Sequence, residues 1–232
     1  MERAGGPKVS SHALDALLGR SLNEVERKFA PRELYTAGPM EIPVPRPRVA
    51  IVGSRDATNQ SLEEAGLIAT TLTRQGVVIV SGLARGIDSA AHKAAIESGG
   101  RTIAVIATPL DRTYPPENAE LQKEIMEKHL AVTQYPIGAA VTKSNFILRN
   151  RTMALISDAS VIVQAGPSSG SLSQGYEALR LGRPLYIWKR VMQSGLAWPK
   201  DMVKYGAMEL TDPEELLENL PSRGVIQISM NA

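Results

Sequence analysis

Two segments decide the fold: RVAIVGSR at residues 48–55 and VVIVSGLARGIDSAAH at residues 77–92. Each begins with a short run of β-branched apolar residues, which is typical of a strand buried on both faces of a parallel sheet. Each run ends in a turn that contains glycine, and helical patterns follow at residues 61–74 and 87–98. The order strand, loop, helix is therefore expected twice in succession.

The same order continues along the rest of the chain. Further strands are expected at residues 102–106, 131–134, 160–164, 185–188 and 207–210. Further helices are expected at residues 116–128, 145–157 and 173–181, with another helix start at residues 211–214. Because strands alternate with helices, the sequence predicts an α/β fold: Rossmann-like and doubly wound, with a mostly parallel sheet and helices on both faces.

The composition excludes several classes of protein. Of 232 residues, 43% are hydrophobic and 22% are charged, which excludes a disordered or fibrous chain. Cysteine is absent, which excludes a disulfide scaffold, a thiol nucleophile and cysteine-based metal sites. The net charge is only +2, so a polyanionic partner must be argued from local clusters. Without a membrane-spanning run or a secretory signal, we expect a cytoplasmic protein.

Three parts are expected along the chain. Residues 1–47 are predicted to be a helical segment and a proline-rich connector: residues 11–29 fit one amphipathic helix, and four prolines lie between Pro39 and Pro47. Residues 48–220 are predicted to form the Rossmann-like domain. Residues 221–232 are predicted to be a frayed tail.

Loops that follow the strands are the expected site, because ligands of doubly wound folds bind beyond the carboxyl ends of the strands. Three of these loops combine glycine or serine with a following helix, whose free N–H groups can bind an anion. Their candidate binding residues are Gly53, Ser54, Arg55, Ser81, Gly82, Arg85, Gly86, Ser169, Gly170 and Ser171. The alternative is that each loop is an ordinary strand exit with solvated side chains.

A cluster of cations around an aromatic ring, KSNFILRNR, occupies residues 143–151. A ring among cations is typical of sites for single-stranded nucleic acid, where bases stack and phosphates are neutralised. The candidate residues here are Lys143, Phe146, Arg149, Asn150 and Arg151. The alternative is a core phenylalanine with solvated cations, since such interleaving is common on protein surfaces.

Acid–base chemistry has few candidates. Asp88 and His92 lie four residues apart on one predicted helix face, but we favour an acid in the first helical turn with a histidine bonded to it. Glu177 could be catalytic in a related nucleotide hydrolase, and we favour an exposed helix residue. We expect no metal, no cofactor and no enzymatic activity.

These motifs together resemble the DprA/Smf family of DNA-processing proteins, a Rossmann-like branch related to the LOG nucleotide hydrolases. The matching segments are IVGSR at 51–55, SGLARGIDSAAH at 81–92, LDRTYPPEN at 110–118, FILRNR at 146–151 and SGSL at 169–172. They occur in family order and spacing over about residues 48–190. The chain is expected to be a short form that lacks the family's full accessory domains.

The resemblance implies a protein that binds single-stranded DNA through the candidate residues above, and we expect a homodimer. It also implies loading of a RecA-type recombinase onto that DNA during recombination or natural transformation. The alternatives are a nucleotide-binding sensor, a LOG-like nucleotide hydrolase, and an adaptor of a mobile element or a defence system. Gln174 stands where the LOG signature has a glutamate, which counts against hydrolysis.

Overall fold

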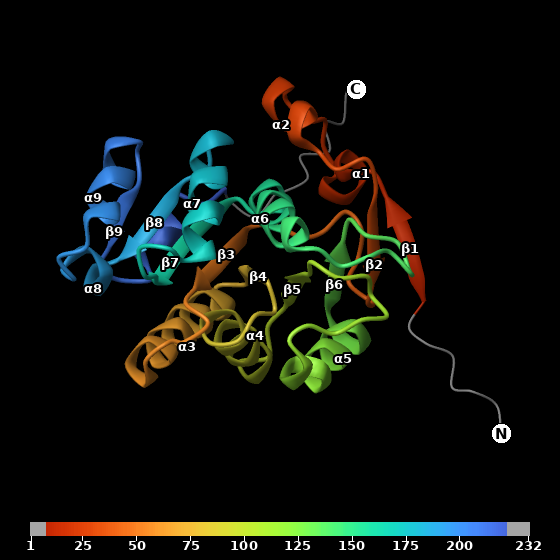
Figure 1. Ribbon diagram of the computed structural model, residues 1–232, viewed down its shortest axis with the longest axis horizontal. Helices are drawn as coiled ribbons and strands as arrows, with labels where there is room; N and C mark the ends of the chain where they lie inside the picture. The colour runs from red at the N-terminus through yellow and green to blue at the C-terminus, as the bar shows by residue number, and fades with distance from the viewer. Residues whose placement is uncertain (1–7, 222–232) are drawn as a thin grey trace, which may run out of the picture.

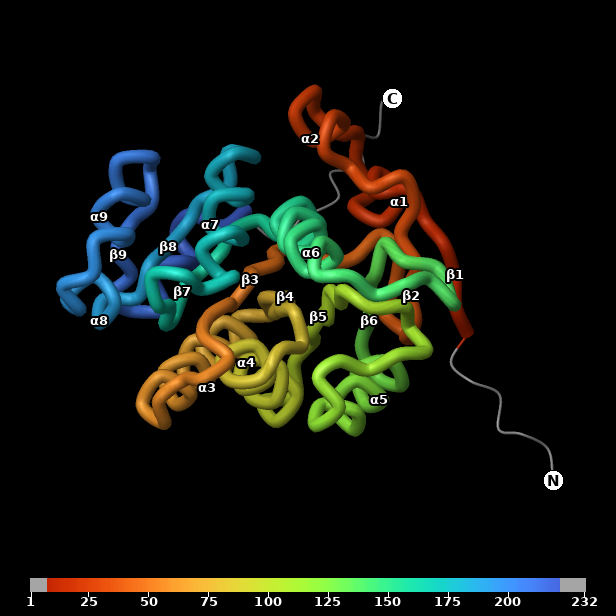
Figure 2. Tube along the Cα trace, viewed as in Figure 1, coloured from red at the N-terminus to blue at the C-terminus, as the bar shows by residue number. Residues whose placement is uncertain are grey.

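One mixed sheet of nine strands runs through residues 8–221, the part of the chain that the computed structural model describes (Figures 1 and 2). The strand order is β1-β2-β6-β5-β4-β3-β7-β8-β9. Neighbouring strands from β6 to β9 are parallel, whereas β2 is antiparallel to β1 and β6. The strands are β1 (Val9–His12), β2 (Leu34–Ala37), β3 (Arg48–Gly53), β4 (Val78–Ser81), β5 (Thr102–Val105), β6 (Leu130–Thr133), β7 (Ala159–Gln164), β8 (Leu185–Trp188) and β9 (Met208–Leu210).

Helices cover both faces of this sheet, so the predicted fold class is confirmed. In Figure 1, α3, α4 and α5 lie below the sheet, and α6 and α7 lie above it. The helices are α1 (Leu14–Leu18), α2 (Glu24–Phe29), α3 (Asn59–Arg74), α4 (Ile87–Glu97), the 3-10 turn η1 (Pro116–Asn118), α5 (Ala119–Lys128), α6 (Lys143–Ile156), α7 (Gly170–Arg180), α8 (Lys189–Met192), α9 (Ala197–Lys204) and α10 (Glu215–Glu218). None of these helices is long and apolar enough to cross a membrane.

Along the central strands, successive side chains point to opposite faces of the sheet, so a hydrophobic core forms on each face. In β3, Val49 and Ile51 belong to the cluster under α3 and α4, and Ala50 and Val52 belong to the cluster under α6 and α7. Successive strand residues point to opposite faces, so one apolar run serves both clusters. Burying a side chain such as Ile51 contributes about 1.5–3 kcal/mol, so the apolar runs stabilise the parallel part of the sheet.

The prediction of one helix over residues 11–29 is wrong. The segment forms β1, α1 and α2, and α1 ends at Gly19 in the left-handed conformation, with φ +68°. Asn23 then begins α2 in a capping box with Glu26. Strands β1 and β2 join the sheet through β6, so they form one sheet with the strands that follow residue 47. The predicted tail lies outside the described residues, except for Pro221.

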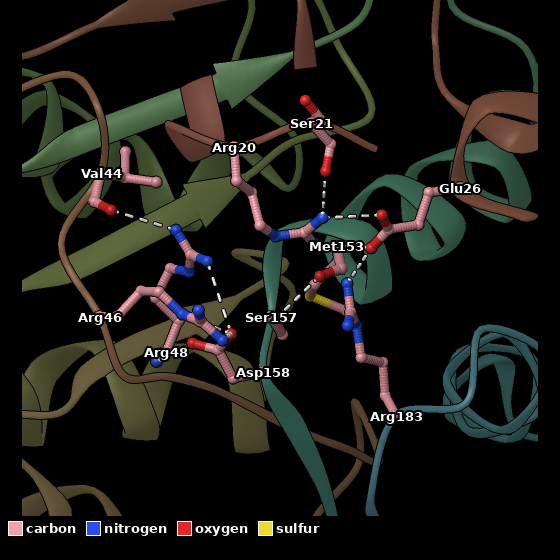
Figure 3. Close-up of polar contacts among 10 residues, drawn as sticks. All are labelled: Arg20, Ser21, Glu26, Val44, Arg46, Arg48, Met153, Ser157, Asp158 and Arg183. Carbon is pink, nitrogen blue, oxygen red and sulfur yellow. Dashed lines mark hydrogen bonds and ion pairs between the residues drawn. The ribbon is translucent and has the colours of Figure 1, made fainter. Parts of the chain in front are cut away.

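Two buried carboxylates tie residues 20–48 to the amino ends of the parallel strands (Figure 3). Glu26 accepts from Arg20, at 2.6 Å, and from Arg183, which lies just before β8. Asp158, just before β7, accepts from the Arg46 side chain at 2.6 Å and from the backbone N–H of Arg48 at 2.9 Å. These pairs lie at the edge of the sheet opposite to the loops that carry the candidate site.

Candidate functional site

A cleft of about 430 Å³ opens where the loops after β3, β4 and β7 meet the side of α6. We call it the rim cleft. It is lined by Val52, Gly53, Ser54, Arg55, Asp56, Ala84, Asp88, Phe146, Ile147, Arg149, Asn150, Met153, Gly166, Ser168, Ser169, Gly170, Ser171, Ser173 and Gln174. The three strands are parallel neighbours in the sheet, so their carboxyl ends bring the three predicted loops and the cationic helix together.

Phe146 stands between the rim cleft and a smaller cavity of about 260 Å³, which we call the Tyr114 pocket. The rings of Tyr114 and Phe146 meet edge to face, with centroids 5.2 Å apart. The guanidinium carbon of Arg55 lies 5.7 Å from the centroid of the Phe146 ring. Arg55 and Lys143 are exposed, and neither forms an ion pair within residues 8–221. Both cations are therefore free to bind an anion beside a stacking ring.

The glycines of the first two loops allow these loops to pack closely against each other. A Cβ on Gly53 would lie 2.5 Å from Ile87, and one on Gly86, at φ +71°, would lie 2.3 Å from the Ser54 carbonyl oxygen. The Ile87 N–H donates to that same oxygen at 3.2 Å, and the Ser54 N–H donates to Gln164. The amides of Ser54 and Ile87 are thus already occupied by partners within the protein.

Arg149 lies beneath the rim, where it holds the second loop. Its side chain is 7% exposed, and Nη1 donates to the Val105 carbonyl oxygen at 3.1 Å. The same nitrogen is 3.9 Å from Asp88, whose carboxylate also accepts the Gly82 and Ala84 N–H groups at 3.1 and 3.4 Å. Burial lowers the pKa of Arg149 and raises that of Asp88. The buried Asp88–Arg149 pair thus holds the loop after β4 in place. Arg149 also lines the rim cleft.

His92 does not pair with Asp88, contrary to the expected bond between them. It is fully buried, and its Nδ1 lies 2.6 Å from the Thr102 hydroxyl oxygen. Burial lowers the pKa of His92 to about 3, so the imidazole is neutral near pH 7 and packs inside the domain. Asp88 and His92 together therefore form no acid–base pair.

Arg151 turns away from the rim cleft. Its guanidinium donates two hydrogen bonds to the Glu177 carboxylate, at 3.0 and 3.1 Å, and lies 4.8 Å from the centroid of the Phe29 ring. Glu177 also pairs with Arg180 and is only 7% exposed. The expectation of an exposed Glu177 is therefore wrong, because two arginines bury this carboxylate between α6 and α7.

Two residues of the second loop have partners of their own. Ser81 is buried and its hydroxyl donates to the Ile51 carbonyl oxygen at 2.6 Å, so it supports the sheet below the rim. Arg85 is exposed between Asp56 and Glu117, with nitrogen–oxygen distances of 3.3 and 3.6 Å. Exposed pairs of this kind are weak, so Arg85 can exchange them for an anion at the Tyr114 pocket, which it lines.

The loop after β7 supplies hydroxyl groups to the rim cleft. Ser169 caps α7, and its hydroxyl lies 2.6 Å from that of Ser171. Asn150 donates to the Gly170 carbonyl oxygen at 3.1 Å and so joins α6 to this loop. Gln174 lies below them and donates to the Ser160 hydroxyl at 2.8 Å.

Tyr114 is the site residue that sequence reasoning missed. Its segment was part of the family resemblance, but nothing in the local pattern distinguished it as a ring at the site. The structure places it opposite Phe146, with the side chain about half exposed. The available signal was the scarcity of aromatic residues, which are only 4% of the chain. Two of these few rings, Tyr114 and Phe146, meet at the carboxyl ends of the strands.

Fold and cleft together define a Rossmann-like α/β protein with cations and aromatic rings at the carboxyl edge of its parallel strands. Comparison with known proteins then gives the family. The chain belongs to the DNA recombination-mediator protein A family, whose model matches residues 15–221.

Relatives and solved structures agree with this assignment. The DNA processing protein DprA of Bacillus subtilis is 33% identical over 84% of this chain and 66% of its own length. The chain spans between 35% and 66% of the length of the first curated relatives that it matches. The structure of DprA from Streptococcus pneumoniae has a TM-score of 0.77 at 31% identity and covers 92% of this chain and 75% of that one. DprA from Helicobacter pylori, whose structure concerns its single-stranded DNA binding mode, has a TM-score of 0.78 at 26% identity and covers 92% and 98%.

Proposed function

We propose that this protein binds single-stranded DNA at the rim cleft and the Tyr114 pocket, as a DNA-processing protein. The observation that carries the proposal is the exposed Arg55 beside the Phe146 ring, with Lys143 at the start of the same helix. Bases stack on rings of this kind while cations neutralise the phosphates, and the combination tolerates any sequence. The related H. pylori protein, described for its single-stranded DNA binding mode, supports it.

The proposed contacts in the rim cleft are Arg55, the Phe146 ring and the hydroxyls of Ser169 and Ser171. Arg85 is proposed to bind at the Tyr114 pocket, which it lines, and Lys143, the first residue of α6, is proposed to bind a phosphate outside both linings. Gly53, Ser54, Gly82, Gly86, Arg149, Asn150 and Gly170 shape the cleft by holding its loops. Ser81 and Arg151 support it from outside the lining. A RecA-type recombinase partner stays a prediction from the family, and a homodimer and a cytoplasmic location stay predictions from the sequence.

Phe146→Ala is expected to weaken binding of oligo-dT by about 1–3 kcal/mol for each base that stacks on the ring, or roughly 5-fold to 150-fold. The measurement is fluorescence anisotropy of a labelled oligonucleotide. Tyr205→Ala is the matched control, because Tyr205 is an aromatic side chain that is 70% exposed and outside both cavities. Equal affinity of Phe146→Ala and the parent would refute the stacking assignment.

Arg55→Ala is expected to flatten the salt dependence of binding. Removing one phosphate-binding cation reduces the slope of log affinity against log salt by about 0.7 for a single strand. Arg74→Ala serves as the control, because Arg74 is exposed at the end of α3, at the other edge of the sheet. If both variants keep the parent's slope, Arg55 does not bind a phosphate.

A further inference from the structure

A third cavity, of about 800 Å³, lies on the other side of α6 and has no part in the function proposed above. We call it the outer groove. Its lining comes from the end of α2, the chain that leads to β2, the end of β6 and one side of α6. In Figure 1 these elements lie between the centre and the right of the picture. The lining residues are Lys28, Phe29, Ala30, Pro31, Arg32, Glu33, Tyr35, Gln134, Tyr135, Leu148, Arg151 and Thr152.

The outer groove carries unpaired positive charge. Lys28 and Arg32 are exposed, and neither forms an ion pair in the described part of the chain. Arg151 is matched by Glu177. Glu33 is the one acid in the lining, and its carboxylate accepts the Tyr35 hydroxyl at 2.7 Å, which lowers the Glu33 pKa. The Glu33 carboxylate stays ionised and interacts with Arg32, so Lys28 and Arg32 together leave the groove with an excess of positive charge for an anion.

Its floor is polar and held by hydrogen bonds. The Gln134 amide donates to the Tyr135 hydroxyl oxygen at 2.7 Å, and the Thr152 hydroxyl donates to Gln134 at 2.9 Å. The Tyr135 hydroxyl in turn donates to the Asn145 carbonyl oxygen, at 3.3 Å, in the first turn of α6. Aromatic rings from β2 and from the segment after β6 therefore line a surface of fixed shape, which suits flat, stacking groups.

Helix α6 joins the two cavities. Phe146, Arg149 and Asn150 line the rim cleft, whereas Leu148, Arg151 and Thr152 line the outer groove. One helix with its side chains is about 10–12 Å across, so a flexible strand can pass from one cavity to the other within a few nucleotides. Ile147 and Leu148 lie on the way and are 57% and 41% exposed.

We propose that the outer groove is a second contact for the same nucleic-acid strand: Lys28 and Arg32 bind phosphates of nucleotides that have left the rim cleft past Phe146. The inference rests on the proposed function. A strand that continues past α6 requires exposed cations for its phosphates and aromatic rings for its bases. The outer groove has both, on the other side of the helix that lines the rim cleft.

The test compares a short with a long oligo-dT, of about 6 and about 20 nucleotides, since sites of this kind take about 4–16 nucleotides. Lys28→Ala/Arg32→Ala is expected to weaken binding of the long oligonucleotide about tenfold and to reduce its salt slope by about 1.4, the value for two phosphates. Binding of the short oligonucleotide is expected to stay at the parent's level. Arg74→Ala/Lys93→Ala is the matched control, because it removes two exposed cations on α3 and α4, the helices that cover the other face of the sheet.

Each outcome separates the two proposals. Both proposals are supported if Phe146→Ala weakens binding of the short and the long oligonucleotide and Lys28→Ala/Arg32→Ala weakens binding of the long one alone. Weaker binding by Phe146→Ala with no effect of the double variant, or with equal effects on the two lengths, overturns the outer groove and leaves the proposed function standing. A parent protein that binds neither length overturns both. Thermal unfolding of the double variant at the parent's temperature checks that the fold is intact.

Discussion

Glu26→Gln is expected to lower the free energy of unfolding by about 3–5 kcal/mol, the usual cost of breaking a buried ion pair from one side. The Glu26 carboxylate is fully buried and accepts from Arg20, Arg183 and the Asn23 N–H. A neutral amide cannot match the two guanidinium groups, which would remain in place with no counter-charge. Urea unfolding measures the difference, provided that the slope m is unchanged.

Glu24→Gln is the control on the same helix, because Glu24 is exposed in the first turn of α2. There the substitution removes only the interaction with the helix dipole, about 0.3–1 kcal/mol. Binding of oligo-dT should be unaffected in both variants, since the rim cleft lies at the other edge of the sheet. If the two variants were equally stable, the ion pairs of Figure 3 would not be what holds the N-terminal segment.

The same carboxylate makes stability depend on pH. Hydrogen bonds from Arg20 lower the Glu26 pKa from 4.5 to about 2 in the folded protein. Because the folded pKa is depressed, the stabilisation is complete above pH 4.5 and is lost as the pH falls toward 2. The stability gap between the parent and Glu26→Gln should therefore be constant near neutral pH and shrink across that acid range.

Gly86→Ala is expected to lower the free energy of unfolding by about 2–6 kcal/mol, as the sum of backbone strain and overpacking. Gly86 has φ +71°, and its Cβ would lie 2.3 and 2.7 Å from the carbonyl oxygens of Ser54 and Arg55. Both clashes are with backbone, so no side-chain rotation relieves them. The first loop must move, and Arg55 moves with it, so affinity for oligo-dT should fall in any fraction that folds.

Gly166→Ala is the matched control, because it adds the same methyl group to another rim loop, with no atom within 4 Å of the new Cβ. Its stability should stay close to the parent's; it is a control for stability alone, because Gly166 lines the rim cleft. Chemical denaturation and oligo-dT anisotropy, measured on the same samples, separate loss of fold from loss of the site. A Gly86→Ala protein as stable as Gly166→Ala would contradict the close packing of the two loops.

Local patterns were sufficient for the parallel part of the sheet, because its strands are continuous apolar runs and its loops are marked by glycine. They failed where short elements depend on distant partners. Residues 11–29 carry a helical pattern, yet β1 forms because β2 offers it an edge, and a turn at Gly19 divides the helix. Helices α8 and α9 follow β8 directly, and their buried Val191, Trp198 and Met202 are recognisable only against the core that they cover.

At the site, residue types were easier to predict than roles. Arg55 and Phe146 lie together at the rim cleft as the pattern indicates, and Lys143 begins the helix that carries Phe146. Sequence spacing could not distinguish them from Arg149 and Arg151, although these lie on the same helix. Arg149 makes a buried hydrogen bond to Val105, and Arg151 lies on the other side of α6, where it binds Glu177. The glycines have packing partners that come from other loops, so their contacts become visible only in three dimensions.

The central claim is that the rim cleft binds single-stranded DNA, and anisotropy of labelled oligo-dT across a salt series tests it most directly. Duplex DNA and AMP serve as competitors. We predict binding that weakens steeply as salt rises from about 50 to 200 mM and that resists both competitors. Absence of DNA binding, with AMP saturating the cleft instead, would contradict the account and make the protein a nucleotide-binding one.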